Sequence, residues 1–200
     1  KRIGADGRLD LNNYFVDWPS VGSTDEYTGA VFIAIATYKK AIALFETLGF
    51  ETETFKQSLA ALYRNDFAVR EKKQVVGLKY FALGEISDEE YAMLVRNGAH
   101  GFSTFMSWFI LEAIASRNEL LAVKLMKEYY GGMLAVGATT FFEDFDLKWL
   151  QHSSVLDELP DIGQKDIHGD FGAHCYVGFR HSLCHGWASG IIAFIKNHCD

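Results

Sequence analysis

The sequence predicts an all-α fold, and three observations lead to that class. Apolar residues recur at helical spacing in one stretch after another, and no stretch shows a convincing strand-like alternation. Capping boxes and single glycines punctuate these stretches. Only two prolines, Pro19 and Pro160, interrupt the 200 residues. With 49% apolar and 22% charged residues, the chain has a globular composition, and we predict one domain over residues 1–200.

Start signals place the helices along the chain. Residues 1–22 are rich in turn formers, and Ser23 followed three residues later by Glu26 predicts a capping box. Ser87 and Glu90 repeat that pattern. We therefore predict helices over about residues 23–48, 53–67, 74–83, 87–97, 103–115, 118–130 and 182–197, with a shorter helical piece at 145–150.

Glycines mark where the predicted helices stop. Gly49, Gly84 and Gly98 each follow directly after a periodic stretch, and Gly131-Gly132 follows the helix at 118–130. Glycine is favoured there because it adopts the left-handed backbone conformation without steric cost. Residues 131–180 are expected to be mostly irregular.

The predicted helices are joined by short loops, so neighbours should be antiparallel. That leaves a bundle, an α-solenoid or an α/α-toroid, and the lack of a fixed-period repeat weakens the solenoid interpretation. In a toroid, inner helices are apolar on most sides and outer helices are not. The helix at 103–115 fits the inner type and the charged helix at 87–97 fits the outer type.

Charge and hydropathy restrict the partners. The formal net charge is −7 and no basic patch is visible, which argues against a nucleic-acid partner. No run of about eighteen apolar residues occurs, so we expect no membrane-spanning helix and no membrane partner. The chain begins Lys1-Arg2 without an apolar signal region, so we expect a fragment of a longer protein. The localisation of that parent stays open, and a secreted or periplasmic parent is among the alternatives.

Two metal- or thiol-based chemistries can be considered near the C-terminus. The cysteines are odd in number, and we expect free thiols rather than a disulfide framework. A histidine- and cysteine-rich segment carries zinc-ligand residue types, but its spacing matches no familiar zinc pattern. His181 precedes Cys184 by three residues and could reach it, yet nothing else supplies an acyl-transfer context. We therefore predict no metal and no cofactor. The residues concerned are His168, Asp170, His174, Cys175, His181, Cys184, His185 and Cys199.

The most informative stretch is 137–145, Gly-Ala-Thr-Thr-Phe-Phe-Glu-Asp-Phe. It places Glu143 directly behind two threonines and two phenylalanines. Aromatic faces stack on the C–H faces of sugars, and a carboxylate can activate water for glycoside hydrolysis. The alternative is a buried turn whose phenylalanines pack in the core. A glycosidase needs a second carboxylate. The candidates in this chain are Asp17, Asp144 and Asp170, and the alternative is a carboxylate outside this chain.

A second aromatic and acidic cluster lies near the N-terminus. Pro19 keeps Trp18 out of the helical region, so Trp18 and its neighbour Asp17 lie on an extended segment or a turn. The tryptophan is either a sugar platform or a plug at the base of the core.

These segments together resemble the C-terminal half of the catalytic domain of the α-L-rhamnosidases, which are six-hairpin glycosidases. The stretch at 137–143 is followed by Ser-Leu-Cys-His-Gly-Trp-Ala-Ser-Gly at 182–190 and preceded by Phe-Val-Asp-Trp at 15–18, in the order of that family. The resemblance covers nearly the whole chain. It implies a partial (α/α)6 barrel and inverting hydrolysis of terminal α-L-rhamnosides. Cys184, where asparagine is usual in the family, leaves the substrate choice open.

The resemblance also implies roles for individual residues. Glu143 matches the general base, His185 a histidine that contacts the sugar, and Trp18 an aromatic residue lining the pocket. We predict Glu143 as catalytic and Asp17, Trp18, Phe142 and His185 as substrate-binding. The family's general acid belongs to the earlier half of the barrel, so this chain alone should have little activity.

Two other functions stay open. One is a different (α/α)-barrel glycan enzyme, such as a uronyl hydrolase or lyase, although the loops are poor in the Arg and Lys that acidic sugars require. The other is a non-catalytic helical carbohydrate-binding module. Half a toroid would leave inner-helix surface uncovered, so we expect an exposed apolar face that the remainder of the parent or a second copy covers.

Overall fold

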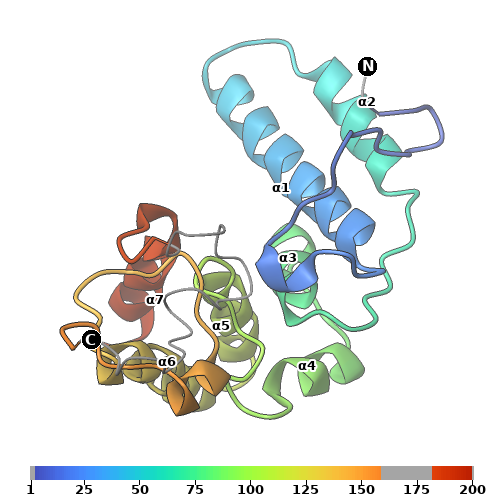
Figure 1. The fold of residues 1–200 in the computed structure, drawn as a ribbon. Coiled ribbons are helices and arrows are strands. Elements are labelled where there is room, and N and C mark those ends of the chain that lie inside the picture. The colour runs from blue at the N-terminus through green and yellow to red at the C-terminus, as the bar shows by residue number, and fades with distance from the viewer. Residues whose placement is uncertain (1–2, 159–181, 200) are drawn as a thin grey trace.

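A computed structural model describes residues 3–158 and 182–199 of the chain, and it confirms the all-α class. This part of the chain is mostly helical and contains no strand. Three short 3-10 segments accompany the helices: η1 (Trp18–Ser20), η2 (Leu147–Gln151) and η4 (Gly186–Gly190). The α-helices are α1 (Glu26–Thr47), α2 (Glu53–Leu62), α3 (Lys73–Leu83), α4 (Asp88–Val95), α5 (Ser107–Ala115), α6 (Glu119–Ala135) and α7 (Ile191–His198) (Figure 1).

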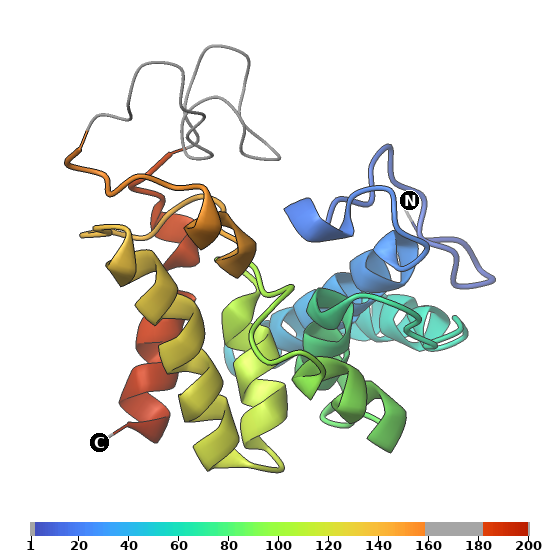
Figure 2. The ribbon, with the colours of Figure 1, turned by 60° about the horizontal axis from the view of Figure 1, so that its bottom comes forward.

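The helices lie in two layers. One layer follows the order α1, α3, α5, α7, in which each helix contacts the next. The other layer contains α2, which packs on α1, then α4, which packs on α3 and α5, and α6, which packs on α5. Figure 2 shows that η1 and the loop after α6 lie at the same end of the helices, at the top of that view.

Two clusters of buried side chains hold the layers together. One is centred on α1 and α3 and includes Val31, Phe32 and Leu62. The other extends from α4 to α7 and includes Tyr129 and Phe194. Burial of such side chains stabilises each cluster by roughly 1.5–3 kcal/mol for every fully buried large residue.

A glycine allows the central helices α3 and α5 to approach closely. A Cβ atom on Gly77 would lie 2.8 Å from the backbone nitrogen of Ile110 and 2.9 Å from the carbonyl carbon of Phe109. No side chain fits that space, so the contact between these helices depends on the absence of one at this position.

Several sequence signals form as predicted. The Ser87 hydroxyl accepts a hydrogen bond from the Glu90 backbone nitrogen at 3.2 Å, and the Glu90 carboxylate accepts one from the Ser87 nitrogen at 2.9 Å. This reciprocal pair is the predicted capping box of α4. Gly84 ends α3 with φ of 84°, a conformation that favours glycine.

The predicted capping box of α1 is wrong. Asp25, at the N-cap, makes no side-chain hydrogen bond to its own helix. Its buried carboxylate instead accepts hydrogen bonds from the backbone nitrogens of Arg70, Glu71 and Lys72, at 2.8–3.2 Å. Tertiary contact with the segment before α3 therefore replaces a local cap, because three aligned backbone donors satisfy a buried carboxylate better than one.

Other helix bounds also differ. The second helix ends at Leu62 rather than Phe67, and α6 continues through Gly131-Gly132 to Ala135. A Cβ on Gly132 would lie 2.7 Å from a Leu147 methyl, so packing there favours glycine within the helix. The predicted C-terminal helix divides into η4 and α7.

Helix α1 also bears on the membrane expectation. In the described part of the chain it is the helix whose length and mean hydropathy, 1.4, would suffice to cross a membrane. However, 44% of that apolar window is buried in the fold, and the core helices of other proteins pass the same test. The absence of a membrane partner therefore stays a prediction.

Candidate functional site

Two segments that are far apart in the sequence pair beside Glu143. The backbone nitrogen of Glu143 donates to the carbonyl of Ser182 at 2.8 Å, and the nitrogen of His185 donates to the carbonyl of Phe141 at 2.7 Å. The Thr140 hydroxyl donates to the Leu183 carbonyl. The sequence stretches that suggested one site are therefore adjacent in space.

The carboxylate of Glu143 is held by this pairing. It is half-buried, and its Oε2 accepts a hydrogen bond from the backbone nitrogen of Ser182 at 2.8 Å. Within residues 3–158 and 182–199, no group donates to its Oε1. The backbone donor fixes one carboxylate oxygen in place, and a general base must be held in position to accept a proton from water.

The segment before α5 connects Glu143 to the N-terminal cluster. The Thr104 hydroxyl donates to the carbonyl oxygen of Glu143 at 2.7 Å, and the hydroxyl of the preceding residue, Ser103, donates to the carboxylate of Asp17. The helix predicted over residues 103–115 begins only at Ser107, because both hydroxyls bond to other segments and neither caps α5.

The Asp17 carboxylate is built into the fold. The side chain is 1% exposed, its Oδ1 accepts from the backbone nitrogen of Trp18 at 2.9 Å, and its Oδ2 accepts from Ser103. Asp17 therefore organises the η1 turn. A direct contact with substrate, as we predicted, would require this buried carboxylate to be uncovered.

Aromatic rings gather next to His185. The Trp187 ring stacks on Phe105, with centroids 4.7 Å apart and an angle of 11°, and the His185 ring lies edge-on to Trp187 at 5.2 Å. Trp187 is 36% exposed, so part of its face is open to a ligand. We did not predict Trp187 as a site residue, although it follows His185 by two positions in the motif that carried the resemblance.

Trp18, the other predicted aromatic residue, lies on η1. Its side chain is half-buried and packs edge-on against Phe15 at 5.0 Å. The hydrogen bonds through Asp17, Ser103 and Thr104 connect this turn to the Glu143 loop.

The structure corrects the role of Phe142. Its side chain is 0% exposed and belongs to the core cluster around α6, with its ring 6.2 Å from that of Phe145. A fully buried ring cannot stack on a sugar. The neighbouring Phe141 is half-buried and lines a hollow between α6 and α7.

Asp144 and Asp170 are the remaining candidates for the second carboxylate. Asp144 is buried, and burial raises its pKa to about 6, opposed by a hydrogen bond from the Phe145 nitrogen. The charges of Asp146 and Glu143 raise its pKa further. Asp170 lies outside the described residues.

The histidine- and cysteine-rich segment also lies mostly outside the described residues, including His168, His174, Cys175 and His181. Cys184 and Cys199 are exposed free thiols. In the part of the chain that the structure describes, no three histidine, cysteine or carboxylate side chains come together as metal ligands would.

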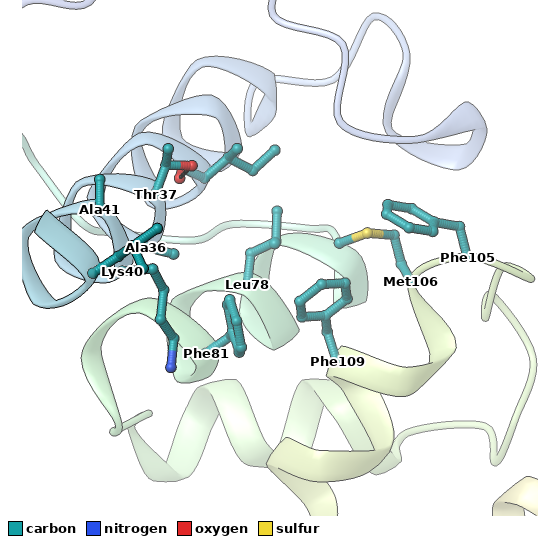
Figure 3. A pocket seen from close by; sticks show the side chains of 11 residues that line it. Ala36, Thr37, Lys40, Ala41, Leu78, Phe81, Phe105, Met106 and Phe109 are labelled. Carbon is teal, nitrogen blue, oxygen red and sulfur yellow. Dashed lines mark hydrogen bonds between the residues drawn. The ribbon is translucent and has the colours of Figure 1, made fainter. Parts of the chain in front are cut away.

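An apolar groove lies on the face of α1, α3 and α5 and has a volume of about 530 Å³. Figure 3 shows side chains from these three segments meeting there, among them Leu78, Phe81 and Phe109. Phe81 is 41% exposed, and Leu44, also on the groove, is 58% exposed. Among the residues that the structure describes, Lys40 is the only charged one that lines the groove.

Comparisons with protein-family models, with curated proteins and with solved structures found no match to this chain. Its function must therefore be argued from the residues and their geometry, because a fold class alone implies no activity. The geometry joins Glu143, His185, Trp187 and the η1 turn at one end of the helices.

Proposed function

We propose that this chain is the C-terminal part of an α-L-rhamnosidase-like glycoside hydrolase in which Glu143 is the general base. The observation that carries the proposal is the pairing of the Glu143 and His185 segments, which the Thr104 and Ser103 hydroxyls tie to the η1 turn. The three segments that carry the family resemblance are separated in sequence, and hydrogen bonds connect them.

The helix layers support the finer fold assignment, a partial (α/α)6 barrel. In this proposal α1, α3, α5 and α7 are inner helices, and α2, α4 and α6 are outer helices. Residues of the candidate site lie before α1, before α5 and before α7, so they gather at the N-terminal end of the inner helices.

The exposed groove supports an incomplete ring. An apolar surface across three helices, with exposed Phe81 and Leu44, is costly to leave in water. In this proposal the remainder of the parent enzyme covers the groove, and a second copy covers it when the chain is alone.

The proposed chemistry is inverting hydrolysis. Glu143 removes a proton from the attacking water, while an acid from the remainder of the barrel protonates the leaving oxygen. His185 contacts the bound sugar, and the exposed part of Trp187 stacks on its C–H face. The family resemblance implies that the substrate is a terminal α-L-rhamnoside.

The test is turnover of p-nitrophenyl α-L-rhamnoside by the longer enzyme that this proposal requires, with and without Glu143→Gln. Loss of a general base should lower kcat by about 10²–10⁴-fold. Glu85→Gln changes an exposed carboxylate between α3 and α4, and it should leave kcat unchanged. Undiminished turnover in Glu143→Gln would contradict the assignment of Glu143 as the general base.

One observation favours a second candidate, a non-catalytic carbohydrate-binding module. The nearby carboxylates Asp17 and Asp144 are both buried, so neither is presented as an acid beside Glu143. In such a module, binding of L-rhamnose would quench Trp187 fluorescence. The Glu143→Gln substitution would not lower the turnover of an enzyme that contains the module.

A further inference from the structure

We propose that the hollow between the start of α3 and the end of α4 is a binding site for a small oxyanion, a carboxylate or a phosphate group. The hollow has a volume of about 200 Å³, and Lys72, Lys73, Arg96 and His100 are among its lining residues. It adjoins Pro19 of η1 and is separate from the apolar groove.

The charge of the hollow is opposite to that of the chain. The formal net charge of the protein is −7, yet three cationic side chains, Lys72, Lys73 and Arg96, line this one hollow. Among the described residues, neither Lys72 nor Arg96 forms a salt bridge. Two unpaired cations around a concave surface attract an anion, and a guanidinium matches the paired oxygens of a carboxylate or phosphate.

Among the described residues that line the hollow, Glu71 is the one carboxylate against three cations, so the lining carries a net positive charge. Glu71 lines the hollow, but its Oε1 accepts hydrogen bonds from the backbone nitrogen and the hydroxyl of Thr24, at 3.1 and 3.4 Å. Glu128, on α6, lies beside Gly98 and acts on the Lys73 ammonium from one side. Thr24 holds Glu71 in place, the backbone nitrogens of residues 70–72 hold the buried Asp25 carboxylate, and Glu128 acts on Lys73. Among the described residues Lys72 and Arg96 form no salt bridge with any of these three carboxylates, so both remain for a ligand.

Lys73 is fixed in position at the base of the hollow. Its Nζ donates to the carbonyl oxygens of Arg96 at 2.8 Å and Gly98 at 2.9 Å, and it lies 5.2 Å from the centre of the Phe102 ring. An ammonium has three donors, so one remains for a ligand. Burial, together with the charge of Arg96, lowers the pKa of Lys73 to about 8, and Glu128 opposes this.

The backbone shapes the rim of the hollow. Asn97 has φ of 61° and Gly98 has φ of 60°, so the chain reverses after α4 and directs the Arg96 and Gly98 carbonyls to Lys73. Asparagine is one of the few residues that tolerate this left-handed conformation.

The experiment is an NMR titration of the ¹⁵N-labelled chain with inorganic phosphate and, separately, with sodium D-glucuronate. D-glucose is the neutral control. We expect saturable shifts confined to about residues 72–74 and 96–101, with Kd on the order of 1 mM for at least one anion. Tighter binding of phosphate would identify a phosphate site, and tighter binding of glucuronate a sugar-acid site.

Matched variants separate a site from general charge attraction. Arg96→Gln should weaken binding at least about tenfold, because it removes the paired donors. The Arg96 side chain is exposed and its carbonyl remains available to Lys73, so folding should persist. Lys124→Gln, an exposed change of equal charge on α6, should leave binding unchanged. Equal losses in both variants, shifts with glucose, or no shifts with either anion would overturn the proposal.

Discussion

The hydroxyl of Thr104 lies 2.7 Å from the carbonyl oxygen of Glu143 and donates a hydrogen bond to it. The Thr104 carbonyl in turn accepts hydrogen bonds from the hydroxyls of Ser107 at 3.2 Å and Tyr130 at 3.3 Å. The loop that carries the candidate base is therefore attached to the beginning of α5 and to α6. This attachment fixes the loop without using the Glu143 carboxylate.

Thr104→Val should destabilise the fold and loosen the Glu143 loop. Valine keeps the shape but leaves the Glu143 carbonyl without this donor, which costs about 1–2 kcal/mol. Urea unfolding measures the effect as a lower midpoint with an unchanged slope. Thr37→Val, at an exposed position of α1, should change stability by less than about 0.5 kcal/mol. Equal effects at the two positions would contradict the role of Thr104.

Two glycine substitutions test the approach of α3 to α5. Gly77→Ala should cost at least about 1–3 kcal/mol, because the added methyl meets the backbone of Phe109 and Ile110. Gly131→Ala lies within α6, where an added Cβ meets nothing within 4 Å, and should stabilise by about 0.5–1 kcal/mol. Thermal unfolding of both variants distinguishes these signs. A neutral Gly77→Ala would show that the helices do not pack this closely.

Stability should decrease as pH rises through the titration of Asp144. Its folded-state pKa, about 6, exceeds the ordinary 3.8, so the folded state favours the protonated carboxyl. Between about pH 4 and pH 7 this one group should lower the free energy of unfolding by on the order of 3 kcal/mol. Asp144→Asn keeps an acceptor for the Phe145 nitrogen and should remove this contribution. Denaturant midpoints measured across that pH range check this prediction. The same pH dependence in the variant and the wild type would contradict it.

His198 should contribute pH dependence of a different origin. Hydrogen bonds to Glu119 at 2.7 Å and Glu112 at 3.2 Å raise its pKa, with burial opposing. The stabilisation is present in full below its unfolded-state pKa and is lost as pH rises through the higher folded-state pKa. His198→Gln should flatten the stability profile near neutral pH, and His152→Gln, the same replacement at an exposed position, is the matched control. NMR titration of the His198 ring measures the pKa directly.

The apolar groove should make the isolated chain associate with itself. Light scattering of the chain alone should show species larger than a monomer, because exposed Phe81 and Leu44 lose contact with water on association. Phe81→Glu should shift the population toward monomer, and Leu120→Glu, an exposed change at the start of α6, should not. A monodisperse monomer of the unmodified chain would contradict the uncovered half-ring.

Local signals in the sequence predicted much of the fold. The Ser87 and Glu90 capping box, the left-handed Gly84 and the apolar periodicity of α5 each specify a helix end or a buried face from neighbouring residues alone. The all-α class followed from the sum of these signals. The motif segments at 137–143 and 182–190 also suggested that Glu143 and His185 belong to one site, and the backbones of these two segments pair in the structure.

The sequence by itself determined most of the helical stretches, because periodicity, caps and residue type act over a few positions. It also suggested which residues to consider for a site. Tertiary structure decided the rest. The carboxylate of Asp25 bonds to the segment before α3 and does not cap α1. The hydroxyls of Ser103 and Thr104 bond to Asp17 and Glu143, and Phe142 lies in the core. The physical reason is that a buried polar group takes the best available partner, and that partner can lie anywhere along the chain.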